Sequence, residues 1–419
     1  MDDLIDSLIR DVESDYPTLD EGLEFAFFLR KQALESSDER AVFDSGETVY
    51  VKIVDDEGAE YIWDYTPSGG RCPSFYGRFC INSTIKMPKT LVTGANGFFA
   101  AHVIDQLIAE GHDVTGSVRS ESKGQQILAR HPEYKGHLDF VLVSDYTVSG
   151  TWDAAFHKTA FDYVIHTAAP LLDDPRNVDF DENFLAPSVK GHSASTYGKN
   201  VKAIAVTGSV NAITTGEDVA TRVYNSQEWL PLSIEDARKD QNPYYSYCVA
   251  KAESEKAIWQ YVKAEKPHYS VTVLLPALIF GPPIQPIFDL KKMNYSTDVF
   301  YSLFNGTYDV TPPTSFPSYI DARDLATAHI KSLTTPAVFN QRLVVGGLPY
   351  SSQLAVNALK NVHQLAGRLP KDNGEVTPVA QFGDVKEWNQ KLNLQLRAPD
   401  QTFGDAARTV LELEKEFKA

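Results

Sequence analysis

Cysteine is scarce in this sequence, where Cys72, Cys80 and Cys248 are the three that occur among 419 residues. Three cysteines cannot form a disulfide framework, and their spacing lacks the paired cysteines and histidines of a zinc site. We therefore predict free thiols, a reducing compartment and no bound metal.

Long apolar runs and an excess of basic charge are also missing. No apolar stretch approaches the length of a membrane span, and the first residues, MDDLIDSLIRD, are acidic where a presequence is basic. The net charge of −17 would repel nucleic acid and anionic membrane surfaces. We expect a cytoplasmic protein, with neither nucleic acid nor a membrane as partner.

The chain changes character near residue 87. Up to residue 60, acidic residues outnumber basic ones more than threefold, which accounts for most of the net charge. Thr-Leu-Asp-Glu at 18–21 has the form of a capping box and predicts a helix over 19–35. Two β-branched or aromatic runs, at 48–53 and 59–63, predict strands. Residues 1–86 are thus predicted to form a small acidic α/β appendage of unknown role.

From Met87 onward, short apolar runs alternate with helical stretches. This alternation is typical of a doubly wound parallel sheet of the Rossmann type, an α/β fold. After Gly281 it loosens into proline-rich loops. We predict one domain over 87–419, with 87–280 mainly binding a dinucleotide and 281–419 mainly forming a smaller C-terminal substrate lobe. The predicted strands are Lys89–Thr93, Asp113–Val118, Leu138–Val143, Tyr163–Thr167, Ala203–Thr207 and Val271–Pro276, and the helices include 98–110 and 246–263.

The first strand runs directly into a glycine turn and then a helix. Gly94 permits the tight turn, Gly97 lets the backbone approach a pyrophosphate, and Ala100 is small enough for close packing of the helix. The helix N-terminus would then face the phosphates with free amides and a positive dipole end. We predict a dinucleotide site here, with contacts from Thr93, Gly94, Asn96, Gly97 and Phe98.

The second strand ends in Arg119, at the position where an NAD enzyme usually has an acidic residue. A guanidinium there would pair with a 2′-phosphate, and Lys123 would add a second charge. This favours NADPH as the cofactor. The alternative is that both side chains are ordinary solvated charges.

Tyr247 and Lys251 lie four residues apart, so they share one face of the predicted helix. A nearby cation is expected to lower the pKa of the phenol, which could then protonate a carbonyl oxygen as hydride arrives at carbon. Ser209, at the end of a buried strand, could hold the same oxygen; its alternative role is a strand-end cap. About one tyrosine and lysine pair at this spacing is expected by chance in such a chain, so the pair alone is weak evidence. Its occurrence together with the glycine turn and Ser209 is what supports a catalytic role.

With these residues identified, the region from Met87 to the C-terminus resembles the extended short-chain dehydrogenase/reductase family. Within it, the chain is similar to the dihydroflavonol-4-reductase-like branch of yeast and fungal aldehyde, methylglyoxal and ketone reductases. The motifs are 92–97 (VTGANG), 118–120 (VRS), 164–170 (VIHTAAP), 223–225 (VYN) with Trp229, 247–251 (YCVAK), 280–283 (FGPP) and 319–324 (YIDARD) with His329.

The resemblance implies roles for individual residues. Ser209, Tyr247 and Lys251 would be the catalytic triad, and Lys251 would also bind the nicotinamide ribose. The other implied cofactor contacts are Thr167, Ala168, Ala169, Asp145, Tyr146 and Pro276. The implied substrate wall is Phe98, Pro170, Val210, Leu278 and the loops after Pro283. His166, at a strand end, is predicted to be structural.

Three segments depart from the family pattern. Gly208 stands where the family usually has serine, which predicts a less firmly held Ser209. Residues 189–192 (VKGH) replace a common Gly-Thr, which predicts altered packing against the cofactor. Residues 242–245 (NPYY) lack the tryptophan-tyrosine signature of cinnamoyl-CoA reductases, which disfavours a CoA thioester substrate.

Together these residues predict NADPH-dependent reduction of an aldehyde or ketone, a small-molecule carbonyl substrate, by a monomer or homodimer. One alternative is an NAD(P)-dependent epimerase, dehydratase or hydroxysteroid dehydrogenase of the same fold. Another is a nucleotide-sensing regulator that does no chemistry. The sequence leaves substrate identity, stereochemistry and oligomeric state open.

Overall fold

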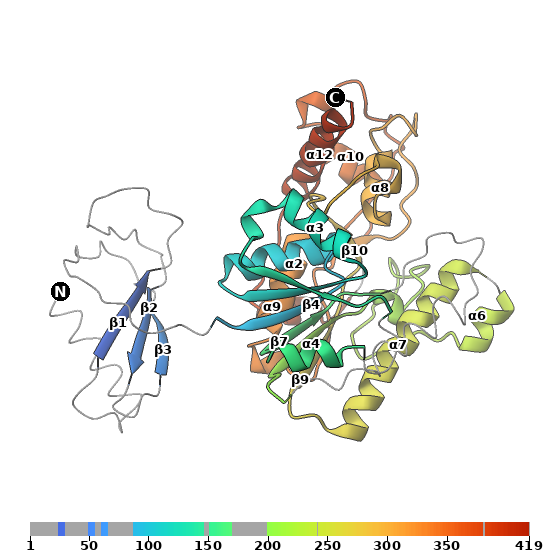
Figure 1. The fold of residues 1–419 in the computed structure, drawn as a ribbon. Helices are drawn as coiled ribbons and strands as arrows, with labels where there is room; N and C mark the ends of the chain where they lie inside the picture. The colour runs from blue at the N-terminus through green and yellow to red at the C-terminus, as the bar shows by residue number, and fades with distance from the viewer. Residues whose placement is uncertain are drawn as a thin grey trace. The chain divides into compact units, whose positions relative to one another are not determined.

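The computed structural model describes residues 24–29, 49–54, 60–65, 87–145, 151–169, 199–240, 242–379 and 382–418. The chain divides into two compact units, Met1–Lys86 and Met87–Ala419 (Figure 1). The described part of the first unit is an antiparallel sheet in chain order, in which Phe27 pairs with Val51 and Val51 with Trp63. Its strands are β1 (Glu24–Leu29), β2 (Val49–Val54) and β3 (Glu60–Tyr65).

The predicted strands at 48–53 and 59–63 are confirmed as β2 and β3. The helix predicted over 19–35 is wrong where the structure describes it, because Glu24–Leu29 is strand β1. This segment, Glu-Phe-Ala-Phe-Phe-Leu, is half phenylalanine, a residue enriched in strands. Pairing with β2 along its whole length outweighs the local preference that the capping box indicated.

The second unit is built on a seven-stranded parallel sheet in the order β12-β9-β8-β7-β4-β5-β6 (Figure 1). The order reverses direction at β4, the first strand of the unit, as in doubly wound nucleotide-binding sheets. The predicted fold class is confirmed. The strands are β4 (Lys89–Thr93), β5 (Asp113–Val118), β6 (Leu138–Leu142), β7 (Tyr163–His166), β8 (Ala203–Thr207), β9 (Ser270–Leu275) and β12 (Arg342–Val344).

Helices cover both faces of this sheet. One core joins the sheet to α2, α3, α9 and α11, and includes Val103, Leu107 and Trp388. A second core on the other face joins it to α4 and α7, and includes Trp152 and Ile258. The helices are α2 (Phe98–Ala109), α3 (Glu121–Arg130), α4 (Asp153–Lys158), α7 (Pro243–Glu265), α9 (Ala322–Ser332) and α11 (Val385–Lys391).

A smaller lobe has its own core, in which the rings of Phe280, Phe300, Tyr319, Tyr350 and Phe403 contact one another. It holds a three-stranded sheet in the order β10-β11-β13 and the helices at the top of Figure 1. The elements are β10 (Leu278–Phe280), β11 (Ser318–Asp321), β13 (Leu348–Pro349), α8 (Tyr295–Ser302), α10 (Ser352–Leu359) and α12 (Pro399–Glu416).

The predicted division at residue 280 needs refinement. After Gly281 the chain returns to the large sheet three times, as α9, as the seventh strand β12, and as α11. The lobe is therefore assembled from several crossings of the chain. This arrangement places its loops beside the carboxyl ends of the parallel strands, where ligands bind in open α/β sheets.

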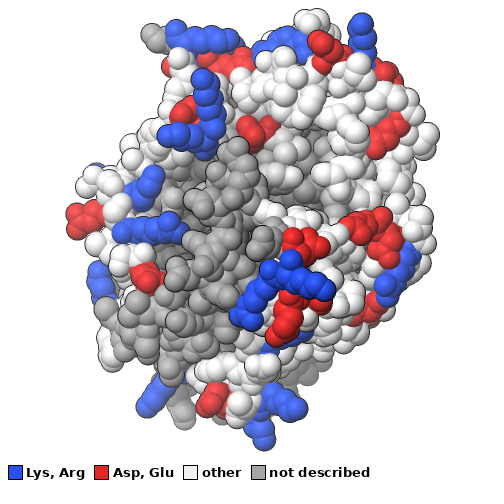
Figure 2. Space-filling model, turned by 90° about the vertical axis from the view of Figure 1, so that its right-hand side faces the viewer, with Lys and Arg blue, Asp and Glu red and all other residues white. Residues whose placement is uncertain are grey.

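Basic and acidic side chains are interspersed on the face shown in Figure 2. Ion pairs of the second unit include Arg323–Asp405 and Arg222–Glu228, both at 2.7 Å. Within the described ranges, no helix is long and apolar enough to cross a membrane. The same ranges contain no group of three or more His, Cys, Asp or Glu that could hold a metal ion.

Candidate active site

The glycine turn follows β4 and leads into α2, as predicted. Gly94 has φ +70°, in the left-handed region that favours glycine. A Cβ atom at Gly94 would lie 3.2 Å from the Cα of Ala168, and one at Gly97 would lie 3.2 Å from the carbonyl oxygen of Gly94. A side chain at Gly94 would therefore press against the residues after β7, and one at Gly97 would press against the turn itself. The turn therefore keeps its backbone open for close approach of a ligand.

The Thr93 hydroxyl ties the turn to the end of β7. It accepts hydrogen bonds from the backbone N–H groups of Thr167 and Ala168, both at 3.0 Å. With both lone pairs used, its own hydrogen is left for Nδ1 of His166, also at 3.0 Å. This contact fits the predicted structural role of His166, because its ring binds the Thr93 hydroxyl, which in turn binds the backbone of Thr167 and Ala168.

Two contacts from β5 fix the turn from the other side. The backbone N–H of Gly94 donates to Oγ of Ser117 at 2.9 Å, and that of Ala95 donates to the Ser117 carbonyl at 2.9 Å. A Cβ at Gly116 would lie only 2.6 Å from the Cβ of Ala95. Sequence reasoning missed Gly116 and Ser117, although a glycine inside a strand signals such a close approach.

Arg119 follows β5 directly, and its side chain is exposed at the strand end. Lys123, in the first turn of α3, is also exposed, with its Nζ 6.0 Å from the centroid of the Phe288 ring. Asp145 follows β6 and is exposed, whereas Tyr146 lies outside the described residues. Arg119 thus lies at the end of β5, the strand that pairs with β4, and Lys123 lies in the helix that follows.

Ser209 lies two residues beyond β8 and is 7% exposed. The backbone on each side of it is bound to the neighbouring strand, because Gly208 N–H donates to the Leu274 carbonyl at 2.8 Å and Val210 N–H to the Pro276 carbonyl at 3.0 Å. The prediction that Gly208 leaves Ser209 loosely held is therefore wrong. Ser209 also caps a short 3-10 turn, Val210–Ala212, so the alternative capping role is present as well.

Tyr247 and Lys251 lie on α7, whose start is set by Asn242 as N-cap and Pro243 as first residue. Nζ of Lys251 is 5.8 Å from the centroid of the Tyr247 ring, so the predicted shared face is present. Burial raises the pKa of Tyr247, and the Ser209 hydroxyl lies close enough to oppose this by favouring the ionised phenol. The end of β8 and the first turns of α7 thus bring Ser209, Tyr247 and Lys251 together.

Burial dominates the electrostatics of this group. It raises the pKa of Tyr247 to about 12, with a smaller contribution from the nearby Cys248 thiol. It also lowers the pKa of Lys251 to about 8. The expectation that Lys251 lowers the pKa of the phenol is not met without a bound cofactor, since desolvation disfavours both charged forms. Tyr247 is therefore a fully protonated phenol, the form that a general acid requires.

The other predicted contacts are distributed around this centre. Thr167, Ala168 and Ala169 follow β7 and are half-buried, and Pro276 follows β9 and is buried. Of the implied substrate wall, Phe98 and Val210 are buried and Leu278 is half-buried. Pro170 and residues 189–192 lie outside the described residues.

The comparisons with known proteins decide the family. A model of the NAD dependent epimerase/dehydratase family matches residues 90–346, which is more than half of the chain. The chain belongs to this family. The matched segment spans the glycine turn, Ser209, Tyr247 and Lys251.

Within the epimerase/dehydratase family, the relatives are fungal reductases. The NADPH-dependent methylglyoxal reductase GRE2 of Saccharomyces cerevisiae is 28% identical over 343 residues, 77% of this chain and 98% of the relative. The ketoreductase azaE of Aspergillus niger is 29% identical over 339 residues, with the same two coverages. The resemblance to this reductase branch, predicted from the motifs, is confirmed.

A solved structure supports the same placement within the epimerase/dehydratase family. The yeast methylglyoxal/isovaleraldehyde reductase Gre2, crystallised with NADPH, matches with a TM-score of 0.69 and 26% identity, over 78% of this chain and 99% of that one. The part not covered is close in length to the first unit, Met1–Lys86.

Sequence reasoning missed the side chain that holds Ser209. Asn211 contacts it through both its side chain and its backbone, and Tyr244 contacts Asn211 in turn. Cys248, next to Tyr247, is buried against the same amide. The only sequence signal was proximity to Ser209 and Tyr247, because polar residues of these types are common in turns and helix starts.

Proposed function

We propose that this chain reduces an aldehyde or ketone to an alcohol, with NADPH as cofactor and Tyr247 as general acid. The observation that carries the proposal is the meeting of Ser209, Tyr247 and Lys251 at the carboxyl edge of the sheet that bears the glycine turn. The NADPH dependence printed for the yeast relative supports it.

The residues around the turn fit a dinucleotide. Gly94 and Gly97 leave open the space that a Cβ would fill, and the N-terminus of α2 begins at Phe98, beyond them. A pyrophosphate there would meet backbone amides and the positive end of the helix dipole. Arg119 and Lys123 are exposed cations that would pair with a 2′-phosphate, which supports NADPH over NADH.

When bound, NADPH supplies the hydride that reaches the carbonyl carbon. The chain's part is to hold and protonate the oxygen. Ser209 and Tyr247 both donate hydrogen bonds to it, and they stabilise the charge that develops there. Tyr247 then gives up its proton as the C–O bond becomes single. Lys251, whose side chain lies along the Tyr247 ring, favours the phenolate that this transfer leaves behind.

Further properties belong to the same proposal. We place the protein in the cytoplasm, acting on a small carbonyl compound as a monomer or homodimer. The scarcity of cysteine and the buried, free Cys248 support a reducing compartment. Arg119 speaks against the epimerases of the family that act on sugar nucleotides, since an acidic residue is usual for tightly held NAD.

The test is consumption of NADPH with a panel of aldehydes and ketones that includes methylglyoxal and isovaleraldehyde. Wild type is expected to oxidise NADPH with at least one member of the panel. Tyr247→Phe keeps the ring and removes the acidic hydrogen, so it should lose most of the activity while NADPH binding, followed by cofactor fluorescence, is retained.

Two results would overturn the proposal. Equal activity of wild type and Tyr247→Phe would show that the phenol is not the acid. Equal inactivity, with NADPH still bound by both proteins, would favour a nucleotide-sensing regulator. The acidic unit Met1–Lys86 is the feature that keeps this second function in view, because an appended unit often serves a partner.

A further inference from the structure

Asn211 holds the Ser209 hydroxyl at two points. Its backbone N–H donates to Oγ of Ser209 at 3.1 Å, and its side-chain Oδ1 accepts from the same Oγ at 3.1 Å. A serine hydroxyl has one hydrogen and two lone pairs. The backbone contact occupies one lone pair, and the side-chain contact takes the hydrogen.

Contacts on the other side of the amide fix its orientation. Nδ2 of Asn211 lies 3.3 Å from the Thr214 carbonyl oxygen, which can only accept. It also lies 2.8 Å from the hydroxyl of Tyr244, which itself donates to the Thr215 carbonyl at 2.7 Å and so must accept from Asn211. These two acceptors require the NH₂ group, so Oδ1 faces Ser209.

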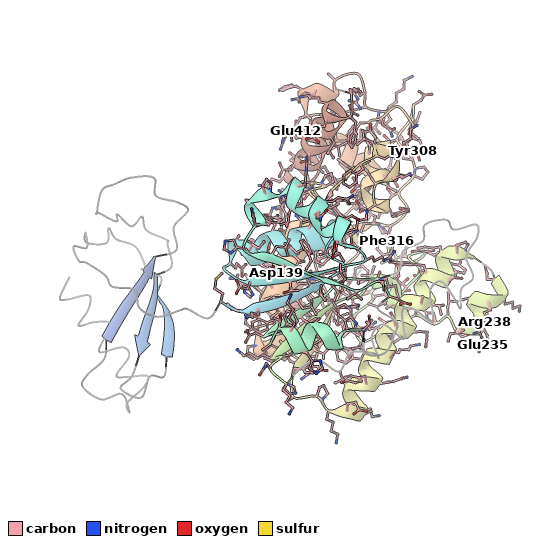
Figure 3. All side chains as sticks on the ribbon, viewed as in Figure 1. Asp139, Glu235, Arg238, Tyr308, Phe316 and Glu412 are labelled. Carbon is pink, nitrogen blue, oxygen red and sulfur yellow. The ribbon has the colours of Figure 1, made fainter. Side chains whose placement is uncertain are left out.

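The loop at 214–217 supplies the Thr214 carbonyl and anchors the Tyr244 hydroxyl through the Thr215 carbonyl. The ring of Phe316, labelled in Figure 3, packs against Gly216 of this loop. Gly216 has φ +92°, and a Cβ there would lie 2.6 Å from the Phe316 ring. The amide of Asn211 therefore rests on a fixed support rather than on a free loop end.

The direction of the Ser209 hydrogen has a consequence for reduction. Ser209 and Tyr247 must both donate to the substrate oxygen, yet the hydrogen of Ser209 points toward Asn211. It must turn from Oδ1 to the substrate, while the backbone N–H of Asn211 keeps Oγ in place. We propose that Asn211, oriented by Tyr244, is a positioning residue that sets where the Ser209 hydroxyl rests and where it turns.

This inference rests on the proposed function, because it concerns the reacting oxygens of that reaction. Once its hydrogen turns away from Asn211, the Ser209 hydroxyl favours the ionised form of Tyr247, so a displaced Ser209 leaves the phenolate less stabilised. A role confined to structure would leave that ionisation unchanged. The kinetic pKa of alcohol oxidation by NADP, which requires the phenolate, is therefore the informative measurement.

The experiment uses the full chain with NADPH and the aldehyde that reacts fastest in the panel. Asn211→Ala and Tyr244→Phe are expected to lower kcat, the first by about tenfold, as for loss of one hydrogen bond made in the transition state. NADPH affinity should stay within about twofold. The kinetic pKa of alcohol oxidation should move upward in both variants, and furthest in Asn211→Asp, where a carboxylate opposes the phenolate.

Tyr245→Phe is the matched control. It removes a phenol hydroxyl from the same helical turn, one that also binds the 214–217 loop but contacts Glu217 rather than Asn211. It should behave as wild type. If Asn211→Ala and Tyr244→Phe keep the wild-type kcat and pH profile, or if Tyr245→Phe matches their losses, Asn211 has no positioning role.

Tyr247→Phe separates the two possible failures. If it stays active, the proposed function is wrong, and the positioning inference falls with it. If it is inactive while the Asn211 variants are unchanged, only the inference falls. Tyr244 is 40% exposed, so Tyr244→Phe remains a usable test should Asn211→Ala fail to fold.

Discussion

Gly208, the residue before Ser209, leads to a prediction about stability, because the serine that is usual in the family at this position would not fit here. A serine or alanine at position 208 would place a Cβ 2.5 Å from Cδ2 of Leu275 and 3.0 Å from Cγ1 of Val273. Both side chains are completely buried, and the Leu274 carbonyl oxygen lies 3.3 Å from the same point. The Leu275 side chain therefore has to shift inside a closed core. We predict that Gly208→Ala destabilises the protein.

The magnitude follows from two opposing terms. Overpacking a well-packed core costs about 1–3 kcal/mol. Gly208 is not among the glycines with positive φ, so alanine adopts the same backbone and its smaller unfolded-state entropy offsets about 0.4–1 kcal/mol. The net loss is roughly 0.5–2 kcal/mol. At about 2–4 °C per kcal/mol for domains of 150–250 residues, the melting temperature should fall by a few degrees.

The assay is thermal unfolding of wild type, Gly208→Ala, Leu275→Val and the double variant. Leu275→Val removes Cδ2, the atom that the new Cβ would meet. Its cost in unfolding free energy should therefore be smaller in the Gly208→Ala background than in wild type. The coupling should exceed about 0.5 kcal/mol, the usual limit of additivity. A Gly208→Ala protein as stable as wild type, or a strictly additive double variant, would refute the steric argument.

Three further predictions concern charge. Glu255→Ala strips the buried partner from Arg342 and should cost about 3–5 kcal/mol of unfolding free energy, whereas Glu253→Ala, in a half-exposed pair on the same helix, should cost under about 1 kcal/mol; similar losses would contradict this. Arg119→Ala should weaken NADPH binding about 10–100-fold and NADH binding far less, and equal losses would argue against a 2′-phosphate contact. Burial lowers the pKa of Lys251 to about 8, so its amine should lose its proton near pH 8 in the cofactor-free protein. Labelling of Lys251 by an amine reagent, measured by mass spectrometry, should therefore reach half its maximum near pH 8. A labelling midpoint near pH 10.5 would show that burial does not lower the pKa.

The elements that were predicted correctly from the sequence share one property. In each of them, the local sequence pattern favours the same structure as the packing around it. β5 and β8 occur at the predicted bounds. β8 is a short apolar run inside a parallel sheet, and its first four residues are buried. α7 begins three residues earlier than predicted, since Asn242 and Pro243 set the start. The glycine turn could be predicted because a strand, Gly94, Gly97 and a helix follow one another within a few residues.

The missed features depend on contacts between distant segments. β12 is only three residues long, and it is a strand because it pairs with β9, about 70 residues away. β1 was predicted as helix because its pairing with β2 leaves no local signal. The role of Asn211 depends on Tyr244, 33 residues further along the chain. The pKa of Tyr247 depends on burial, which a pattern of residue types does not reveal.

The Thr93 hydroxyl has a further consequence for the motions of this edge of the sheet. Loops begin where parallel strands end, and their amides ordinarily exchange hydrogen with solvent through small local openings. The amides of Thr167 and Ala168 instead share one acceptor inside the sheet, and His166 holds that acceptor from behind. Releasing either amide means pulling Thr93 away from its neighbours. We therefore expect the end of β7, beside the glycine turn, to open on the slow timescale of the whole sheet, whereas the proposed reaction needs only the rotation of the Ser209 hydroxyl.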